Sequence, residues 1–135
     1  MTTRVFLNGQ WLAAEDARVS VMDRGFLFGD GIYEVIPVYS RRPFRLEQHL
    51  TRMQHSLDGI RLANPFSIDA WMGFVTQLAS EAEWEDQSIY LQVTRGPMAV
   101  RNHAFPKQIT PTVVDRKSTR LNSSHAELSR MPSSA

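Results

Sequence analysis

The stretch GIYEVIPVY, residues Gly31–Tyr39, restricts the kind of fold that this chain can adopt. Tyr33 and Val35 fall on one face of an extended strand, and the residues between and after them, such as Ile36, fall on the other. An alternation of two predicts a β-strand. Pro37 cannot donate a hydrogen bond to a neighbouring strand, which favours an edge position or a bulge.

Further strands are predicted on either side of this stretch. In RVFLNGQWLAA, apolar residues flank Asn8 and Gly9, a pair that supplies the positive φ angles of a type I′ hairpin turn. Later in the chain, SIYLQVT at residues 88–94 alternates as a strand does, and TPTVV at 110–114 predicts the start of another.

Two helices are predicted between these groups of strands. Apolar residues recur at steps of three and four in residues 46–62 and again in residues 68–84, and Ser67 is the expected N-cap of the second helix. The order of strands, two helices and strands predicts an α+β fold, with a mostly antiparallel sheet and the two helices on one face. The side chains expected between helices and sheet are Leu46, Leu50, Met53, Leu57, Trp71, Val75 and Leu78.

Composition excludes several classes of protein. The 135 residues are 42% hydrophobic and 10% aromatic, which is typical of one folded domain. A net charge of +1 argues against nucleic acid or an anionic membrane as a partner. The absence of cysteine excludes disulfides and thiolate metal sites. With no membrane-spanning run and no signal-peptide pattern, the expected location is the cytoplasm.

The character of the chain changes near Asp115. Residues 115–135, DRKSTRLNSSHAELSRMPSSA, contain no aromatic residue, no valine and no isoleucine. A segment so poor in large apolar groups cannot offset the entropy of ordering by burial. We therefore expect the folded domain to span residues 1–114, and residues 115–135 to be a disordered tail that does not belong to the fold.

Two segments are candidates for a functional site. DRGFLFGDGIYEV, residues 23–35, carries three glycines that indicate either turns with positive φ or a backbone passing close to a ligand, the first being favoured. RGPMAVRNHAFP, residues 95–106, places two arginines and a histidine in a loop bounded by prolines. Guanidinium groups match carboxylate and phosphate geometry, so this loop predicts either a solvated basic surface or an anion site.

Histidines 49 and 55 are too far apart on a helix to share a metal, and no metal site is predicted.

Taken together, these segments resemble the N-terminal domain of class IV (fold type IV) pyridoxal-phosphate aminotransferases. The matching pieces are FLNGQWL, DRGFLFGDGIYEVIPVY, FRLEQHLTRM and YLQVTRGPMAVRNHAFP. The Arg-x-His-x-Phe-Pro ending, residues 101–106, is most similar to the D-amino-acid transaminase branch of that family.

The resemblance implies a role for five residues. Arg52 would bind the phosphate of pyridoxal 5′-phosphate, and its helical position two residues after Leu50 already places it off the apolar stripe. Tyr33 and Val35 would line the substrate side of the pocket. Arg101 and His103 would hold the substrate carboxylate, reaching across the interface of a homodimer.

The resemblance also implies that part of the enzyme is missing. Transamination needs a lysine that carries the cofactor covalently and moves a proton. The two lysines, Lys107 and Lys117, lie outside any pattern like the family's lysine motif, so no catalytic residue is predicted in this chain. The parent protein would move an amino group between a D-amino acid such as D-alanine and a 2-oxo acid such as 2-oxoglutarate. The alternatives are a branched-chain aminotransferase, an aminodeoxychorismate lyase, or a non-catalytic folded or association fragment.

Overall fold

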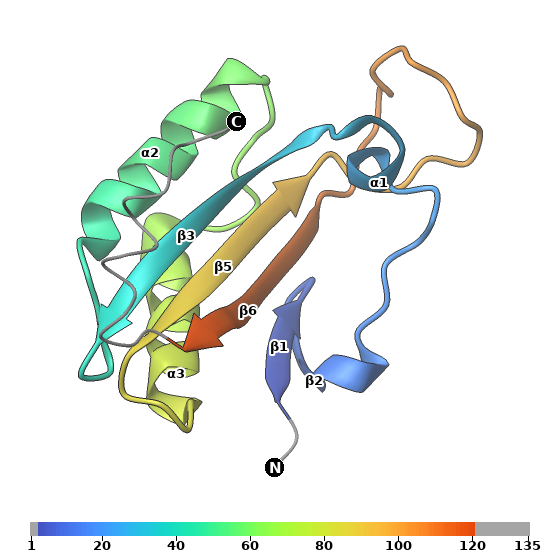
Figure 1. The fold of residues 1–135 in the computed structure, drawn as a ribbon. Helices are drawn as coiled ribbons and strands as arrows, with labels where there is room; N and C mark the ends of the chain where they lie inside the picture. Colours follow the sequence, from blue (N-terminus) through green and yellow to red (C-terminus); the bar gives the residue numbers. More distant parts are fainter. Residues whose placement is uncertain (1–2, 121–135) are drawn as a thin grey trace, which may run out of the picture.

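The predicted strands assemble into one antiparallel sheet in the computed structural model, which describes residues 3–120 (Figure 1). The strand order is β2-β1-β6-β5-β3-β4, and every pair of neighbours is antiparallel. The strands are β1 (Arg4–Leu7), β2 (Gln10–Ala13), β3 (Gly31–Tyr39), β4 (Arg42–Pro43), β5 (Gln87–Thr94) and β6 (Thr112–Arg120). The helices are a 3-10 turn η1 (Ala14–Asp16), α1 (Arg24–Phe28), α2 (Leu46–Gly59) and α3 (Ile68–Glu81).

The first hairpin is built as the sequence predicts. β1 and β2 pair from Leu7 and Gln10 outward, and the two residues between them have positive φ angles, 51° at Asn8 and 89° at Gly9. Both central residues of a type I′ turn need such angles, and asparagine and glycine adopt them most readily. The hairpin prediction is therefore confirmed.

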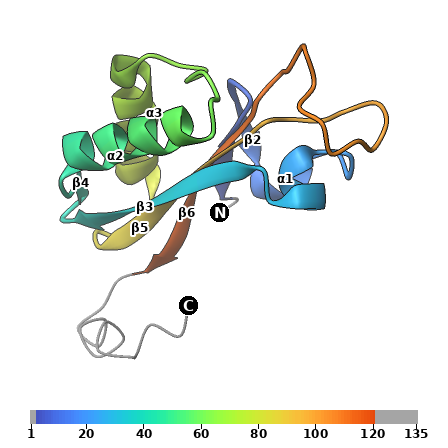
Figure 2. The ribbon, with the colours of Figure 1, turned by 90° about the horizontal axis from the view of Figure 1, so that it is seen from above.

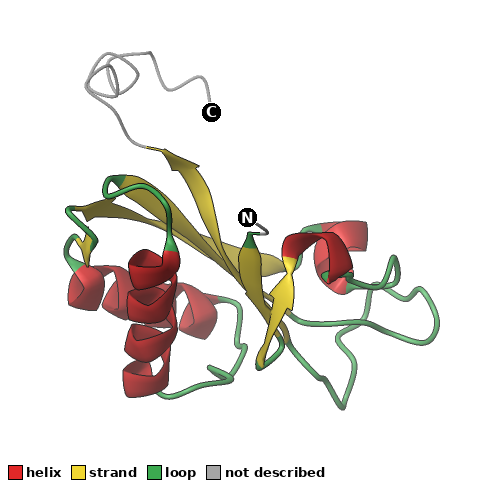
Figure 3. Cartoon of the chain, turned by 90° about the horizontal axis from the view of Figure 1, so that it is seen from below, coloured by secondary structure: helices red, strands yellow, loops and turns green. Residues whose placement is uncertain are grey.

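The two long helices cover one face of the sheet, as predicted (Figures 2 and 3). The Oγ of Ser67 accepts a hydrogen bond of 3.1 Å from the backbone N–H of Ala70, so the predicted N-cap is confirmed. Leu46, in the first turn of α2, is only partly buried. The remaining six predicted core residues are buried, namely Leu50, Met53, Leu57, Trp71, Val75 and Leu78.

The last strand continues beyond the predicted end of the domain. β6 lies between β1 and β5, and Asp115 stands opposite Leu91 within it. The boundary after Val114 therefore does not hold for residues 115–120, because a β-ladder pairs through backbone groups and can extend into a segment of few apolar side chains. The rest of the predicted tail, residues 121–135, lies outside the described residues.

Asp115 is a polar side chain in an apolar layer. It is fully buried on the face of β6 that meets the helices, and neither of its carboxyl oxygens has a hydrogen-bond partner within residues 3–120. Burial raises the pKa of the Asp115 carboxyl well above its usual range. A buried polar group without a partner opposes folding.

Within residues 3–120, neither of the long helices α2 and α3 packs on the other face of the sheet (Figure 2). Tyr33 of β3 stacks on Tyr90 of β5 with ring centroids 5.6 Å apart, and the guanidinium of Arg116 lies 4.9 Å from the ring of Tyr90. We refer to this surface as the open face. Within residues 3–120, none of the helices is both long and apolar enough to cross a membrane.

Candidate functional site

A buried carboxylate joins β3 to α2 at the base of the candidate site. Glu34 points to the helix-covered face of β3 and its side chain is 5% exposed. The Nε and Nη2 of Arg52 each donate a 2.8 Å hydrogen bond to one oxygen of Glu34. This side-on, two-point pairing holds the plane of the guanidinium at a defined angle to the sheet.

A histidine completes this cluster. The Nδ1 of His49, one helical turn before Arg52, lies 2.8 Å from Oε1 of Glu34. Burial alone would raise the pKa of the Glu34 carboxyl, but hydrogen bonds and charge attraction from Arg52 and His49 bring that pKa below its usual value. Glu34 is therefore a carboxylate at neutral pH, and it keeps Arg52 in place.

Arg52 keeps capacity for a second anion. Its side chain is 66% exposed, which confirms that it leaves the core stripe. The Nη1 group has no hydrogen-bond partner among the described residues, because Glu34 takes only Nε and Nη2. Arg52 lines an open depression of about 350 Å³ together with Glu47, Gln48, Thr51 and His55. An oriented guanidinium at a solvent-filled depression can bind a phosphate or a carboxylate.

Tyr33 and Val35 flank Glu34 in sequence and lie on the opposite side of the sheet. Both are exposed on the open face, as the alternation of β3 predicts. The strand thus sends Glu34 toward α2 and presents Tyr33 and Val35 to solvent. Their exposure leaves them accessible to a ligand on that face.

The two remaining candidates, Arg101 and His103, lie on the loop between β5 and β6. Both side chains are exposed and both pack on the ring of Phe28 at the end of α1. The imidazole of His103 is 4.7 Å from the centroid of Phe28, and the guanidinium of Arg101 is 5.0 Å from it. The loop therefore presents a cation and an imidazole side by side on an aromatic platform.

The other arginine of the loop segment has a structural role. Arg95 is buried, and its Nε donates to Asp30 at 2.8 Å while its Nη2 donates to the carbonyl of Ile60 at 2.6 Å. Its guanidinium is used for contacts within the domain. Only Arg101 of the two is free to meet a ligand from solvent.

The three glycines of DRGFLFGDG are required for two different reasons. Gly29 ends α1 with φ of 65°, the left-handed conformation that the turn interpretation predicts. Gly25 and Gly31 do not have positive φ; they are needed because the backbone approaches β5 closely. A Cβ on Gly25 would lie 2.3 Å from Cγ2 of Thr94, and one on Gly31 would lie 2.6 Å from the carbonyl oxygen of Val93.

One chain does not bring all five candidates together. Within residues 3–120, no hydrogen bond, ion pair or ring contact joins Arg101 or His103 to Tyr33, Val35 or Arg52. Arg52 lies beside the helix-covered face, and Tyr33 and Val35 lie on the open face. The loop extends from the end of the sheet that carries α1 (Figure 2).

Sequence reasoning missed two members of the Arg52 cluster, Glu34 and His49. The signal for Glu34 was present: it is a charged residue among Ile32, Ile36 and Val38 on the inward face of a strand, where a carboxylate needs a cationic partner. His49 lies three residues before Arg52 and so shares its helix face. Nothing in the sequence states that β3 lies under this turn of α2.

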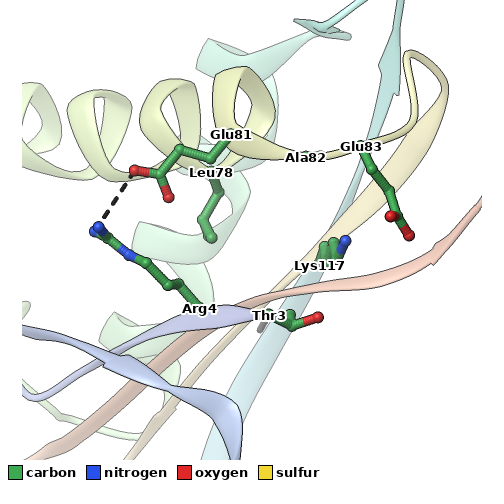
Figure 4. A pocket seen from close by; sticks show the side chains of 7 residues that line it. All are labelled: Thr3, Arg4, Leu78, Glu81, Ala82, Glu83 and Lys117. Carbon is green, nitrogen blue, oxygen red and sulfur yellow. Dashed lines mark ion pairs between the residues drawn. The ribbon is translucent and has the colours of Figure 1, made fainter. Parts of the chain in front are cut away.

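The described lysines lie away from this cluster. Lys107 is exposed in the β5–β6 loop. Lys117 lies with its ammonium 4.7 Å from the ring of Trp84, beside a pocket of about 280 Å³ (Figure 4). Arg4 and Lys117 enter that pocket from the sheet, and Glu81 enters it from the end of α3 and pairs with Arg4 at 3.5 Å.

The residues of the Arg52 cluster fit the phosphate end of pyridoxal phosphate. Arg52 offers a free, oriented donor group to a phosphate. Lys117 lies on β6 opposite Ile89, near the start of β5, whereas the β5–β6 loop begins at the other end of these strands. Within residues 3–120, no cluster of three or more His, Asp or Glu side chains is arranged to hold a metal ion.

Comparison with known proteins places the chain among aminotransferases. Residues 31–134 match the family model described as amino-transferase class IV. A D-alanine aminotransferase of Staphylococcus epidermidis is 42% identical over 111 residues, which are 82% of this chain and 38% of that protein. The chain thus spans well under half the length of this curated relative.

Solved structures share the fold. A branched-chain amino acid aminotransferase of Escherichia coli superimposes with a TM-score of 0.79 at 22% identity, covering 92% of this chain and 43% of that one. The 4-amino-4-deoxychorismate lyase of Pseudomonas aeruginosa has a TM-score of 0.72 at 27% identity, with the same two coverages, 92% and 43%. A T.th. branched-chain amino acid aminotransferase, solved with N-(5′-phosphopyridoxyl)-L-glutamate, has a TM-score of 0.75 at 20% identity, covering 85% and 40%.

Proposed function

Because the chain belongs to the class IV aminotransferase family, we propose that it is the N-terminal part of a transaminase acting on D-amino acids. The parent protein would move an amino group between a D-amino acid such as D-alanine and a 2-oxo acid such as 2-oxoglutarate. The observation that carries this choice of substrate is the 42% identity to a D-alanine aminotransferase over 82% of the chain.

In this proposal, Arg52 binds the phosphate of the cofactor. Pyridoxal phosphate, when bound, supplies a ring that withdraws electrons from the carbon carrying the amino group. Arg52 would hold the phosphate through its free Nη1, because Glu34 keeps Nε and Nη2 engaged. Tyr33 and Val35 would shape the substrate side from the open face. None of these side chains supplies the lysine that the chemistry needs.

Arg101 and His103 would bind the substrate carboxylate in a homodimer. Both are exposed on the β5–β6 loop, and within the described chain neither contacts Arg52 or Tyr33. A loop that extends from the end of its own domain is suited to reach the site of a second subunit. The proposal therefore includes a dimer in which each loop serves its partner.

The chain as it stands should not turn over substrate. We expect no pyruvate from D-alanine, because Lys107 and Lys117 lie apart from Arg52. The test is incubation with pyridoxal phosphate, borohydride reduction and peptide mapping, followed by an assay with D-alanine and 2-oxoglutarate. A stoichiometric adduct at Lys107 together with D-alanine-dependent pyruvate would contradict the expectation.

The two anion sites can be separated in a full-length parent. Arg101→Ala and His103→Ala should weaken binding of D-alanine and leave cofactor affinity nearly unchanged. Arg52→Ala should raise the concentration of pyridoxal phosphate needed for activity. Loss of a charge-assisted bond to a desolvated anion costs about 2–5 kcal/mol. A decarboxylated amine serves as the control substrate, and equal losses on it and on D-alanine would show that the loop does not read the carboxylate.

Two observations support other candidates. The fold matches branched-chain aminotransferases at TM-scores up to 0.79, and the lyase match reaches 27% identity. The same full-length protein, assayed with D-alanine, L-leucine and aminodeoxychorismate, separates these activities. The remaining candidate is a non-catalytic folded or association fragment, for which no substrate would give turnover.

A further inference from the structure

The loop that carries Arg101 and His103 has little to fix it from within. Between Gly96 and Thr112 it forms no helix and no strand, and residues 101–105 are exposed. Among the described residues, the one hydrogen bond within this loop joins the N–H of Ala104 to the side chain of Asn102 at 3.0 Å. A long exposed segment of this kind samples many conformations unless another element restrains it.

Near its start the loop is held by a single β-bridge between Pro97 and Asp23 and by a 3.1 Å hydrogen bond from the N–H of Met98 to the carbonyl of Met22. The exposed part, residues 102–104, is bound by one buried guanidinium. Arg24, the first residue of α1, is 3% exposed. Its Nη1 donates to the carbonyl oxygens of Asn102 at 2.8 Å and Ala104 at 3.2 Å, and its Nη2 donates to that of His103 at 3.2 Å. Three consecutive carbonyl groups of the loop are therefore bound by a single side chain. α1 and the loop lie together at one end of the domain (Figures 1 and 2).

Arg24 is itself held by a shared counter-ion. Its Nε donates to Oδ2 of Asp30 at 2.8 Å, and the Nε of the buried Arg95 donates to the same oxygen at 2.8 Å. Burial alone would raise the pKa of the Asp30 carboxyl, but its hydrogen bonds and charge attraction with Arg95 and Arg24 bring that pKa below its usual value. The carboxylate therefore stays charged at neutral pH and fixes the guanidinium between β3 and the loop.

The same helix supplies the surface on which the two ligand side chains rest. Phe28 lies 5.0 Å from the guanidinium of Arg24 and contacts both His103 and Arg101. The backbone of residues 102–104 and the side chains of Arg101 and His103 are therefore held by two residues of α1. The DRGFLFGDG segment therefore contacts the loop in addition to forming turns.

We infer that Arg24 is the positioning residue of the carboxylate-recognition loop: by binding the carbonyl groups of residues 102–104 it sets where Arg101 and His103 can meet a substrate. That this loop recognises a carboxylate rests on the proposed function. That Arg24 restrains the loop does not depend on it. Lysine cannot replace Arg24, because a single ammonium group cannot reach three carbonyl groups and Asp30 in the planar arrangement of a guanidinium.

The test compares the wild-type chain with Arg24→Lys. Arg41→Lys is the matched control, since Arg41 also donates to a backbone carbonyl, that of Ala82, far from the loop. Circular dichroism and thermal unfolding establish that each variant folds. Limited trypsin digestion then measures cleavage after Arg101, with cleavage after the exposed Arg18 as the internal reference. We expect Arg24→Lys to speed cleavage at Arg101 about tenfold and Arg41→Lys to leave it unchanged. Equal rates in all three chains would overturn the inference.

A measurement on the wild-type chain keeps the inference testable if Arg24→Lys does not fold. In nitrogen-15 NMR spectra, the Nη protons of Arg24 should give resolved, slowly exchanging signals, whereas those of Arg18 should be averaged by rotation and exchange. Averaged signals for Arg24 would contradict a fixed guanidinium.

Titration with D-alanine and with ethylamine separates the two hypotheses. Shifts of the amides of Asn102 and Ala104 with D-alanine alone, lost in Arg24→Lys, support both. A loop released in Arg24→Lys but indifferent to D-alanine in the wild type would uphold the positioning role and count against the carboxylate function.

Discussion

Replacing Asp115 with valine should stabilise this domain. Asp115 occupies an inward-facing position of β6, between Phe6 of β1 and Leu91 of β5, and is fully buried. Its two carboxyl oxygens have no hydrogen-bond partner within the described chain. Valine has a similar volume and suits a strand, so the substitution removes the polar group without creating a large cavity.

Two contributions set the size of the effect. Burial of an unpaired polar group costs about 1–3 kcal/mol in proteins, and burial of a valine side chain contributes about 1.5–3 kcal/mol. Relaxation of the structure around Asp115 reduces the sum. We therefore expect the free energy of unfolding at pH 7 to rise by about 2–5 kcal/mol.

The effect must depend on pH in one direction. Burial raises the pKa of Asp115 in the folded state above its ordinary value of 3.8, so the folded state binds the proton more tightly than the unfolded state does. The contribution of Asp115 to the stability of the wild-type chain is then most favourable below pH 3.8, and it is lost as the pH rises toward the folded-state pKa. Across that window the advantage of Asp115→Val should grow by up to about 1.4 kcal/mol per pH unit.

Urea unfolding of the wild type, Asp115→Val and Asp115→Asn between pH 4 and pH 8 measures these quantities. Asparagine does not titrate but stays polar, so it separates the cost of the charge from the cost of an unpaired group. Comparing variants at each pH cancels the contributions of the other carboxylates. The reasoning fails if wild type and Asp115→Val have equal stability at pH 7 and parallel pH profiles, because Asp115 would then be solvated or paired.

Two further substitutions probe contacts beside the candidate site. Glu34→Gln should lower the free energy of unfolding at pH 7 by about 1–2 kcal/mol, the exposure of Arg52 limiting the loss. Because the folded-state pKa of Glu34 is lowered, this stabilisation is lost as the pH falls through that pKa, and urea unfolding at pH 3 should show a smaller difference. Gly25→Ala should destabilise by about 1–3 kcal/mol, because the new Cβ would meet Cγ2 of Thr94. Gly59→Ala is its control: apart from the neighbouring residues and the backbone of its own helix, no atom lies within 4 Å of that Cβ, and chemical denaturation should show a gain of about 0.5–1 kcal/mol. A loss at both glycines would argue against the close approach at Gly25.

The fold could be predicted because its signals are local. The turn at Asn8-Gly9, the cap at Ser67 and the apolar stripes of α2 and α3 each depend on residues within a few positions of one another, and the structure confirms them. The end of β6 could not be predicted in this way. The pairing of β6 with β1 and β5 uses backbone groups that every residue carries, so the amino-acid composition of the segment does not predict it.

For the candidate site, residue types and their local positions could be predicted, and contacts could not. The exposure of Arg52 and the shared face of Tyr33 and Val35 follow from helical and strand periodicity alone. The proposed roles of Arg101 and His103 as carboxylate ligands remain predictions that rest on the family resemblance.

The amino-acid sequence therefore established the α+β class, the positions of strands and helices, the family resemblance and the residues with ligand-binding chemistry. Three-dimensional packing was needed to reveal that Glu34 holds Arg52, that Arg24 binds the carbonyl groups of the loop 78–80 residues later, and that Asp115 is buried without a partner among the described residues. The physical reason is the distance along the chain over which each kind of interaction acts. Periodicity and turn preference act between neighbours in the chain, whereas a guanidinium selects its partner by distance in space, which depends on how β3, α1 and the β5–β6 loop are stacked.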